Sequence, residues 1–246
     1  MRKYYTYYIE HLRNWWMITL SFIIFHLSFS VALTSCETDS YDKGEGKYSQ
    51  MQADFVVAGV GSDQRVDYVV TDEGDSLLAF PRFTTQSIEK ADTTYRAILY
   101  YKLVNDDAGR AAVEAMGLSL VPTLTAHTPE EMDSLVGDMK TDPVKFESIW
   151  LARNRRFVNV SIILMTGQPD TDDVHQTLAL MCDSVQHHAD GRATACCRLY
   201  HDQGGVPEYY SLQRYLSIPV SSLAADTLRL SIQTYADPVV KSISLK

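Results

Sequence analysis

Residues 95–103, Tyr-Arg-Ala-Ile-Leu-Tyr-Tyr-Lys-Leu, form the longest run of alternating side chains in this sequence. Apolar or aromatic residues occupy every second position: Tyr95, Ala97, Leu99, Tyr101 and Leu103. Because successive side chains of a strand point to opposite faces, this run predicts a strand with one buried face. Shorter runs on both sides are separated by turn residues such as Glu73-Gly74-Asp75. About five strands between residues 50 and 124 favour a small barrel.

The second half of the chain also predicts strands. Short apolar runs alternate with loops rich in Gly, Pro and Asp, and we expect about seven strands: Phe146–Leu151, Phe157–Met165, His175–Cys182, Thr194–His201, Tyr215–Val220, Thr227–Tyr235 and Val239–Leu245. This number and spacing favour a sandwich of two sheets.

One short helix is predicted between the two halves. Thr128-Pro129-Glu130-Glu131 is a capping box with proline at the first helical position, and Gly137 is a suitable C-terminal stop. We place the domain boundary at this helix and the stretch that follows it. The barrel domain is therefore expected at 49–140 and the sandwich domain at 141–246.

The first 35 residues have the order of a secretory signal peptide. Basic residues precede an uncharged apolar run at 15–33, which ends in Leu33-Thr34-Ser35-Cys36. A cysteine at the cleavage site resembles a bacterial lipoprotein signal, so we expect Cys36 to be lipidated. The alternative is an uncleaved transmembrane anchor, because the run is nearly long enough to span a bilayer.

Residues 36–48 are polar, acidic and glycine-containing, which predicts a flexible leash. An acidic stretch behind the lipidated cysteine resembles the surface-export signal of one group of Gram-negative lipoproteins. We therefore expect an outer-membrane lipoprotein exposed at the cell surface. An ordinary solvated linker, with the protein on the periplasmic face, is the alternative.

The overall charge is acidic, at −9, and becomes −11 once the signal peptide removes three basic residues and one acidic residue. Such a surface repels nucleic-acid phosphates, so no nucleic-acid partner is expected. The sequence has no Gly-x-Ser-x-Gly elbow and no glycine-rich phosphate loop. We therefore expect neither an enzyme nor a cofactor.

Three cysteines remain after the lipidated one: Cys182, Cys196 and Cys197. They fall on two consecutive predicted strands around the Asp190-Gly191 turn. Cys182 could therefore lie opposite Cys196 or Cys197 and form a cross-strand disulfide. Buried free thiols are the alternative, and a redox or metal role is less favoured because no Cys-x-x-Cys spacing occurs.

From Asp142-Pro143 to Trp150 the sequence resembles the NigD-like lipoproteins. The resemblance continues through Phe157-Val158-Asn159-Val160, His175, Leu199-Tyr200-His201 and Ser217-Ile218-Pro219-Val220. Phe157-Val158 replaces the usual Tyr-Leu, and Arg153-Asn154-Arg155-Arg156 stands where the family has glycines. The resemblance implies an all-β chain, with an OB-like barrel followed by an immunoglobulin-like sandwich.

The resemblance also implies a function in bacteriocin immunity or an accessory role. We therefore expect a non-catalytic, lipid-anchored envelope protein that binds a protein partner. The alternative is a surface accessory protein that binds glycans.

Few residues are candidates for a site. Three tyrosines that follow a Gly-Gly turn could form an exposed aromatic patch: Tyr209, Tyr210 and Tyr215. The alternative is that they are partly buried, as tyrosines in folded proteins commonly are. His175 and His201 could hold a metal or exchange protons, but histidines at strand ends more often bind loop backbone. We expect Trp150 to anchor the sandwich core rather than to stack on a ligand.

Overall fold

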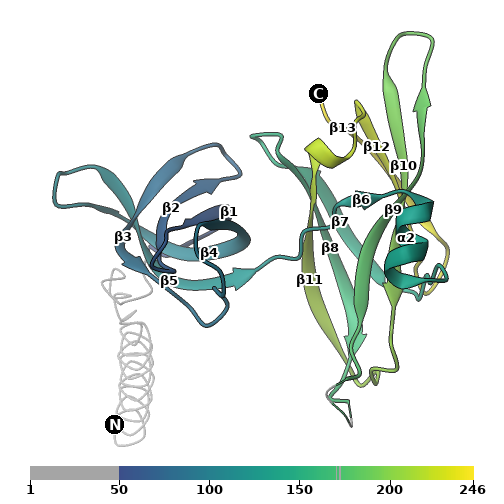
Figure 1. The fold of residues 1–246 in the computed structure, drawn as a ribbon, viewed down its shortest axis with the longest axis horizontal. Helices are drawn as coiled ribbons and strands as arrows, with labels where there is room; N and C mark the ends of the chain where they lie inside the picture. Colours follow the sequence, from purple (N-terminus) through teal and green to yellow (C-terminus); the bar gives the residue numbers. More distant parts are fainter. Residues whose placement is uncertain (1–49, 170, 172) are drawn as a thin grey trace, which may run out of the picture. The chain divides into compact units, whose positions relative to one another are not determined.

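The computed structural model describes residues 50–169, 171 and 173–246 (Figure 1). The signal peptide at 1–35, the lipidation site Cys36 and the leash at 36–48 lie outside these residues. Residues 51–246 form one compact unit. No helix in the described part of the chain is both long and apolar enough to cross a membrane.

The N-terminal half is a closed barrel with strand order β1-β2-β3-β5-β4. The strands are β1 (Gln52–Val60), β2 (Val66–Thr71), β3 (Ser76–Phe83), β4 (Thr93–Asn105) and β5 (Ala111–Leu120). Strands β3 and β5 pair in parallel, and the other pairs are antiparallel. This arrangement is that of a five-stranded OB-type barrel, which confirms the predicted fold of this half.

Strand β4 supplies the buried face that its alternation predicts. Ala97, Leu99 and Tyr101 are buried in the barrel core. Leu103 departs from the pattern and is 55% exposed. The pairing explains the difference, because β1 begins at Gln52, opposite Tyr101, and β4 continues past that point against β5 alone.

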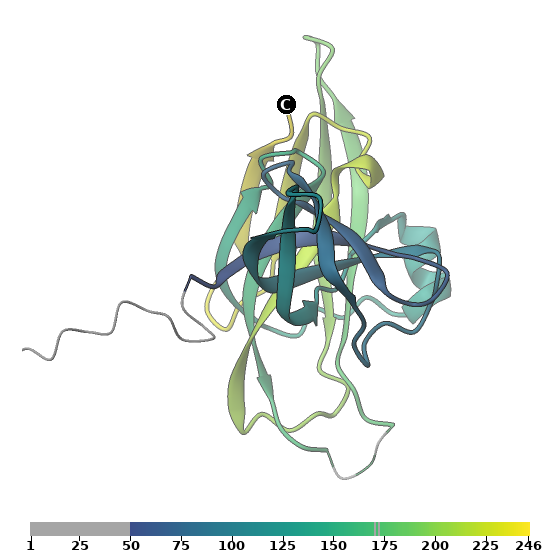
Figure 2. The same ribbon diagram turned by 90° about the vertical axis from the view of Figure 1, so that its left-hand side faces the viewer.

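The C-terminal half is a sandwich of a five-stranded and a three-stranded sheet, with orders β13-β12-β10-β9-β6 and β11-β8-β7. Its strands are β6 (Ala126–His127), β7 (Lys145–Leu151), β8 (Phe157–Thr166), β9 (Thr177–His187), β10 (Ala193–Asp202), β11 (Tyr210–Pro219), β12 (Thr227–Ile232) and β13 (Val239–Ser244). The all-β class and the sandwich are thus confirmed. The hairpin of β9 and β10 extends beyond the rest of its sheet in both views (Figures 1 and 2).

The sandwich core lies between its two sheets. Alternate residues of β8 and β12, and of the C-terminal half of β11, are buried there: Val158, Val160, Ile162, Leu164, Leu216, Ile218, Leu228, Leu230 and Ile232. Alternation of this kind places the intervening residues of β8 and β11 on the opposite face of the three-stranded sheet.

The predicted helix is α2 (Pro129–Val136), and its capping box is present. Thr128 Oγ1 accepts a hydrogen bond from the backbone of Glu131, whose carboxylate accepts one from the Thr128 backbone. Met132 packs against Met181 and Tyr200 of the five-stranded sheet. The helix precedes residue 141, the expected start of the sandwich domain, yet it packs on the sandwich because β6 has already paired with β9.

A polar network connects β4 of the barrel with β8 and β11 of the sandwich. The buried guanidinium of Arg96 donates to Asn159 Oδ1 at 2.9 Å and to Ser217 Oγ at 3.0 Å. Asn159 also donates to Asp72 Oδ2 at 2.8 Å. The rings of Phe55 and Phe157 lie 5.2 and 4.2 Å from the guanidinium carbon. Because these polar groups satisfy one another, their burial does not leave uncompensated charge.

Candidate ligand-binding site

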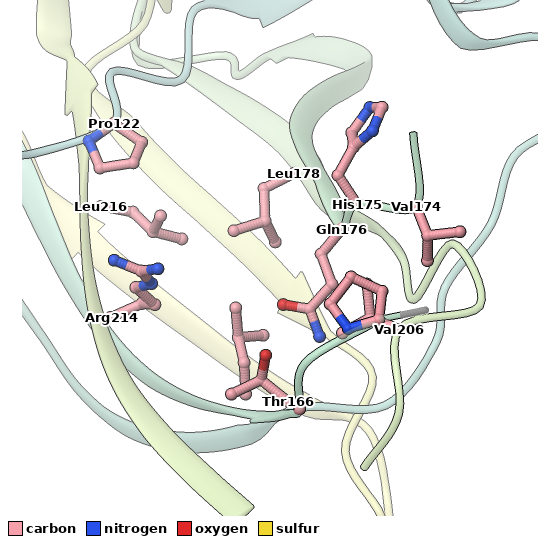
Figure 3. A pocket seen from close by; sticks show the side chains of 12 residues that line it. Pro122, Thr166, Val174, His175, Gln176, Leu178, Val206, Arg214 and Leu216 are labelled. Atoms are coloured by element: carbon pink, nitrogen blue, oxygen red, sulfur yellow. The ribbon is translucent and has the colours of Figure 1, made fainter. Parts of the chain in front are cut away.

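A cavity of about 520 Å³ opens at one end of the sandwich. Figure 3 shows the side chains around it, which come from the ends of β8 and β9, the middle of β11 and the adjoining loops: Pro122, Leu164, Thr166, Gly167, Pro169, Val174, His175, Gln176, Leu178, Val206, Arg214 and Leu216. The volume is within the range of small-molecule sites, roughly 300–1,000 Å³. Among the described residues, no carboxylate lines the cavity.

The apolar floor of the cavity is continuous with the sandwich core. Leu164 and Leu216 are buried members of that core, and Leu178 of the opposite sheet packs against it. Leu164 and Leu216 are almost fully buried, so the half-buried Leu178 presents most of the leucine surface to the cavity.

Arg214 is a basic residue of β11 at a position where the alternation of the strand would place an apolar side chain. Leu216 and Ile218 face the core, and Arg214 occupies the next position of the same face toward the open end. Its cross-strand partner is the buried Ile162. Within the described part of the chain, no hydrogen bond or ion pair engages its guanidinium. Figure 3 shows this group on the side of the cavity opposite Gln176.

Gln176 is held in place by its amide nitrogen. This nitrogen donates to the Met165 carbonyl at 2.6 Å and to Gln203 Oε1 at 2.9 Å. Gln203 in turn donates to the Val206 carbonyl at 2.8 Å. With the nitrogen engaged in this way, the Gln176 oxygen is turned toward the cavity (Figure 3). The wall therefore carries a fixed hydrogen-bond acceptor.

The loop at His175 is packed closely on the β10–β11 turn. His175 Nδ1 lies 3.0 Å from the Asp173 carbonyl oxygen. Gly204 has φ +59°, and a Cβ there would lie 2.1 Å from the His175 carbonyl oxygen. Only glycine fits this approach, so the turn fixes one edge of the cavity.

The predicted tyrosine patch is only partly formed. Tyr209 is 79% exposed and Tyr210 is 56% exposed. Tyr215 lies on the opposite face of its sheet, where its ring is 5.3 Å from Phe55 and 6.4 Å from Trp150. Register explains the separation, because Tyr215 pairs with Ser161 on the face away from the sandwich core. Trp150 therefore packs in this cluster and is not part of the sandwich core.

A different tyrosine adjoins the exposed pair. Tyr235, 54% exposed, has its hydroxyl 3.5 Å from the carboxylate of Glu208, the residue before Tyr209. We name Tyr209, Tyr210 and Tyr235 the tyrosine group. It adjoins the cavity, because the Tyr209 ring lies 2.9 Å from where a Cβ on the cavity-lining Gly167 would be. Sequence spacing alone could not connect residues 209 and 235.

The two predicted histidines have different surroundings. His201 is buried on β10, with Nδ1 3.0 Å from the Asp142 carbonyl oxygen, and its Nε2 has no partner among the described residues. His175 precedes β9 at the edge of the cavity rather than lying in the strand as predicted. Asp202, beside His201, is paired with Lys140 at 2.6 Å. No group of three His, Cys, Asp or Glu side chains suited to a metal ion occurs among the described residues.

The three cysteines are free thiols. Cys182 and Cys197 face each other in the β9–β10 pairing, while Cys196 is opposite Ser184 across a bulge. Burial and the neighbouring Cys182 raise the pKa of the Cys197 thiol. The structure therefore has free thiols, the alternative to a disulfide. Cys182 and Cys197 are nevertheless the pair whose register would allow a cross-strand disulfide.

No protein-family model matches the chain, and no curated protein matches it. Solved structures do. A NigD-like immunity protein from Bacteroides caccae is 23% identical, with a TM-score of 0.61 over 78% of this chain and 92% of that chain. A candidate toxin-related protein from Parabacteroides distasonis is 16% identical, with a TM-score of 0.58 over 78% and 92%.

A candidate lipoprotein from Bacteroides fragilis is 12% identical, with a TM-score of 0.54 over 80% of this chain and 99% of that chain. These likenesses extend over the barrel and the sandwich together. They confirm, at the level of the fold, the NigD-like resemblance that the sequence predicts.

Proposed function

We propose that this is a non-catalytic binding protein of the bacterial cell envelope, anchored by lipid at Cys36, that recognises a toxin of the bacteriocin class. The fold likeness to a NigD-like immunity protein and to a candidate lipoprotein supports this reading. The sequence from the signal peptide to Cys36 supports the anchor. A shared fold does not establish a shared function, so we examine which surface of the sandwich could bind the toxin.

The tyrosine group is the observation that carries the proposal. Tyr209, Tyr210 and Tyr235 are all more than half exposed, at 79%, 56% and 54%. Tyrosine offers a large amphipathic contact area with few rotatable bonds, so little conformational entropy is lost when a partner covers it. Tyrosine is accordingly frequent among the residues that dominate protein interfaces. We assign this group as the contact surface for the toxin.

A protection assay tests the proposal. A bacteriocin-sensitive strain would express the full-length protein and be exposed to culture supernatants of bacteriocin producers. We expect survival with the native protein and loss of survival with Tyr209→Ala/Tyr210→Ala at equal protein level. The matched control is Tyr68→Ala/Tyr100→Ala, which removes two exposed tyrosines of the barrel. Equal survival with both double variants, or no protection by the native protein, would refute toxin binding through this group.

Glycan binding is the second candidate, because exposed aromatic faces also stack on sugar rings and Glu208 lies beside Tyr209 and Tyr235. A glycan array probed with the full-length protein separates the two candidates. Retention that disappears in Tyr209→Ala/Tyr210→Ala, together with an absence of protection, would favour the glycan.

The outer-membrane surface is the proposed location. Protease treatment of intact cells should remove the native protein but spare a Cys36→Ala variant, which lacks the lipidation site. If the native protein survives until the outer membrane is permeabilised, it lies on the periplasmic face.

A further inference from the structure

The cavity between the sheets combines an aliphatic floor with one unpaired cation. Leu164, Leu178 and Leu216 supply the floor, and Arg214 supplies the charge. Neither feature is needed by the proposed toxin-binding surface. The combination therefore calls for its own explanation.

Arg214 lines the cavity without the ion pair that some arginines of the sandwich make. Arg198 makes a two-pronged ion pair with Asp183 on the outer face of the five-stranded sheet. Arg214 shares the face of Leu216 and Ile218 but lies at the open end of β11, where its side chain is exposed, and within the described residues it has no ion-pair partner. An exposed guanidinium is hydrated while the cavity is empty, and an anion that enters the cavity can take the place of that water. Here the partner position is open to the cavity.

The chemistry of the walls defines the missing partner. A guanidinium binds a planar carboxylate through two parallel hydrogen bonds. One cation matches one negative charge, and among the described lining residues no carboxylate competes for it. The leucine floor excludes a hydrated ion but favours methylene groups. A ligand with one carboxylate and an aliphatic chain satisfies both requirements.

We propose that this cavity binds a straight-chain aliphatic carboxylate, with its carboxylate on Arg214 and its chain against Leu164, Leu178 and Leu216. The Gln176 oxygen on the opposite wall carries partial negative charge and repels anionic groups (Figure 3). It thereby orients the carboxylate toward Arg214. The site would make the protein a carrier or sensor of such acids, independently of its protein partner.

Equilibrium dialysis of radiolabelled decanoate tests the proposal. The full-length protein would be held in phosphatidylcholine nanodiscs, and uptake by empty nanodiscs would be subtracted. We expect saturable binding at one site per chain. Decanol and decyltrimethylammonium, which keep the chain but lack the carboxylate, should bind at least tenfold more weakly.

Variants at Arg214 test the charge. Arg214→Gln should weaken decanoate binding about tenfold or more, because the charged hydrogen bonds are lost. The decanoate affinity of Arg214→Lys should lie between those of the native protein and Arg214→Gln, because lysine keeps the charge but lacks the planar guanidinium. The matched control is Arg229→Gln, an exposed arginine between the buried Leu228 and Leu230 of β12, and binding should not change.

Varying the length of the ligand's aliphatic chain tests whether the chain packs against the leucines of the cavity. Affinity should rise about fourfold for each methylene from octanoate to decanoate, as expected for burial in an apolar site. Leu178→Trp should block the chain, with its thermal unfolding curve recorded to verify the fold. The length series needs no variant and stands if this substitution does not fold.

Three results would overturn the proposal: no saturable uptake above that of empty nanodiscs, equal binding of decanol and decanoate, or unchanged binding by Arg214→Gln. A short peptide ending in leucine serves as the competing carboxylate. If it binds more tightly than decanoate and loses binding in Arg214→Gln, the site takes peptide termini and the aliphatic acid is the wrong ligand.

Discussion

Arg96 and Asp72 form a two-pronged ion pair in which both nitrogen–oxygen distances are 2.7 Å. The Arg96 side chain is only 3% exposed and that of Asp72 is 16% exposed. Arg96 lies in a barrel strand, and its other bonds reach the sandwich at Asn159 and Ser217. One side chain thus serves both halves of the described unit.

Replacing Arg96 should therefore be costly. Arg96→Ala leaves the Asp72 carboxylate with little solvent and no cation, and breaking a buried pair in this way costs about 3–5 kcal/mol. The control is Arg82→Ala, which breaks exposed ion pairs with Asp63 and Asp67 and should cost much less, because water screens exposed charges. Denaturant unfolding of both variants measures the difference. Similar losses in the two variants would show that the buried network contributes little to stability.

The acid dependence of stability should involve Asp202. Its hydrogen bonds from Lys140 and from the Gly204 backbone lower the pKa of this carboxyl below its usual 3.8. A lowered folded-state pKa contributes stability that is present above the unfolded-state pKa and is lost as pH falls through the folded value.

In urea unfolding from neutral pH to about pH 2.5, the stability gap between the native protein and Asp202→Asn should close below about pH 4. Asp237→Asn, at an exposed carboxylate, should show a smaller gap at neutral pH. A gap for Asp202→Asn that is unchanged in acid would contradict the assignment.

Much of the fold follows from local patterns. The alternation at 95–103 predicts β4 and its buried face, and Thr128 with Glu131 predicts the start of α2. These local patterns do not reveal where the chain leaves the barrel and begins to pair with strands of the sandwich. The helix was expected with the barrel, but it packs on the sandwich because the two-residue strand β6 pairs with β9. So short a strand gives no periodic signal.

The site was harder to predict because it depends on register. Tyr210 and Tyr215 are close in sequence, yet they lie on opposite faces of β11. The pairing of Arg214 with the buried Ile162 shows that its side chain lies on the same face of the sheet as Leu216 and Ile218. Only the alternation of Arg214 with Leu216 and Ile218 could have indicated this position from the sequence.

Gly204 should be intolerant of any side chain. Gly204→Ala introduces strain at φ +59° and places a Cβ 2.1 Å from the His175 carbonyl oxygen. Gly191→Ala is the matched control, because φ is +81° there and no atom lies within 4 Å of the added Cβ. Backbone strain alone costs about 1–3 kcal/mol, so unfolding should show a larger loss for Gly204→Ala, which adds a steric clash. Equal losses would mean that the loop moves aside without cost.

Cys197 should be the least reactive thiol of the described residues. Burial, and then the nearby Cys182, raise the pKa of Cys197, and the thiolate is the form that attacks alkylating reagents. With iodoacetamide at about pH 8 and without denaturant, we expect Cys196, half-buried, to be modified before Cys197. Mass spectrometry of the peptides identifies each site. Modification of Cys197 as fast as Cys196 would contradict its burial, whereas a linked Cys182–Cys197 peptide would show that the opposed thiols have oxidised to the disulfide their register allows.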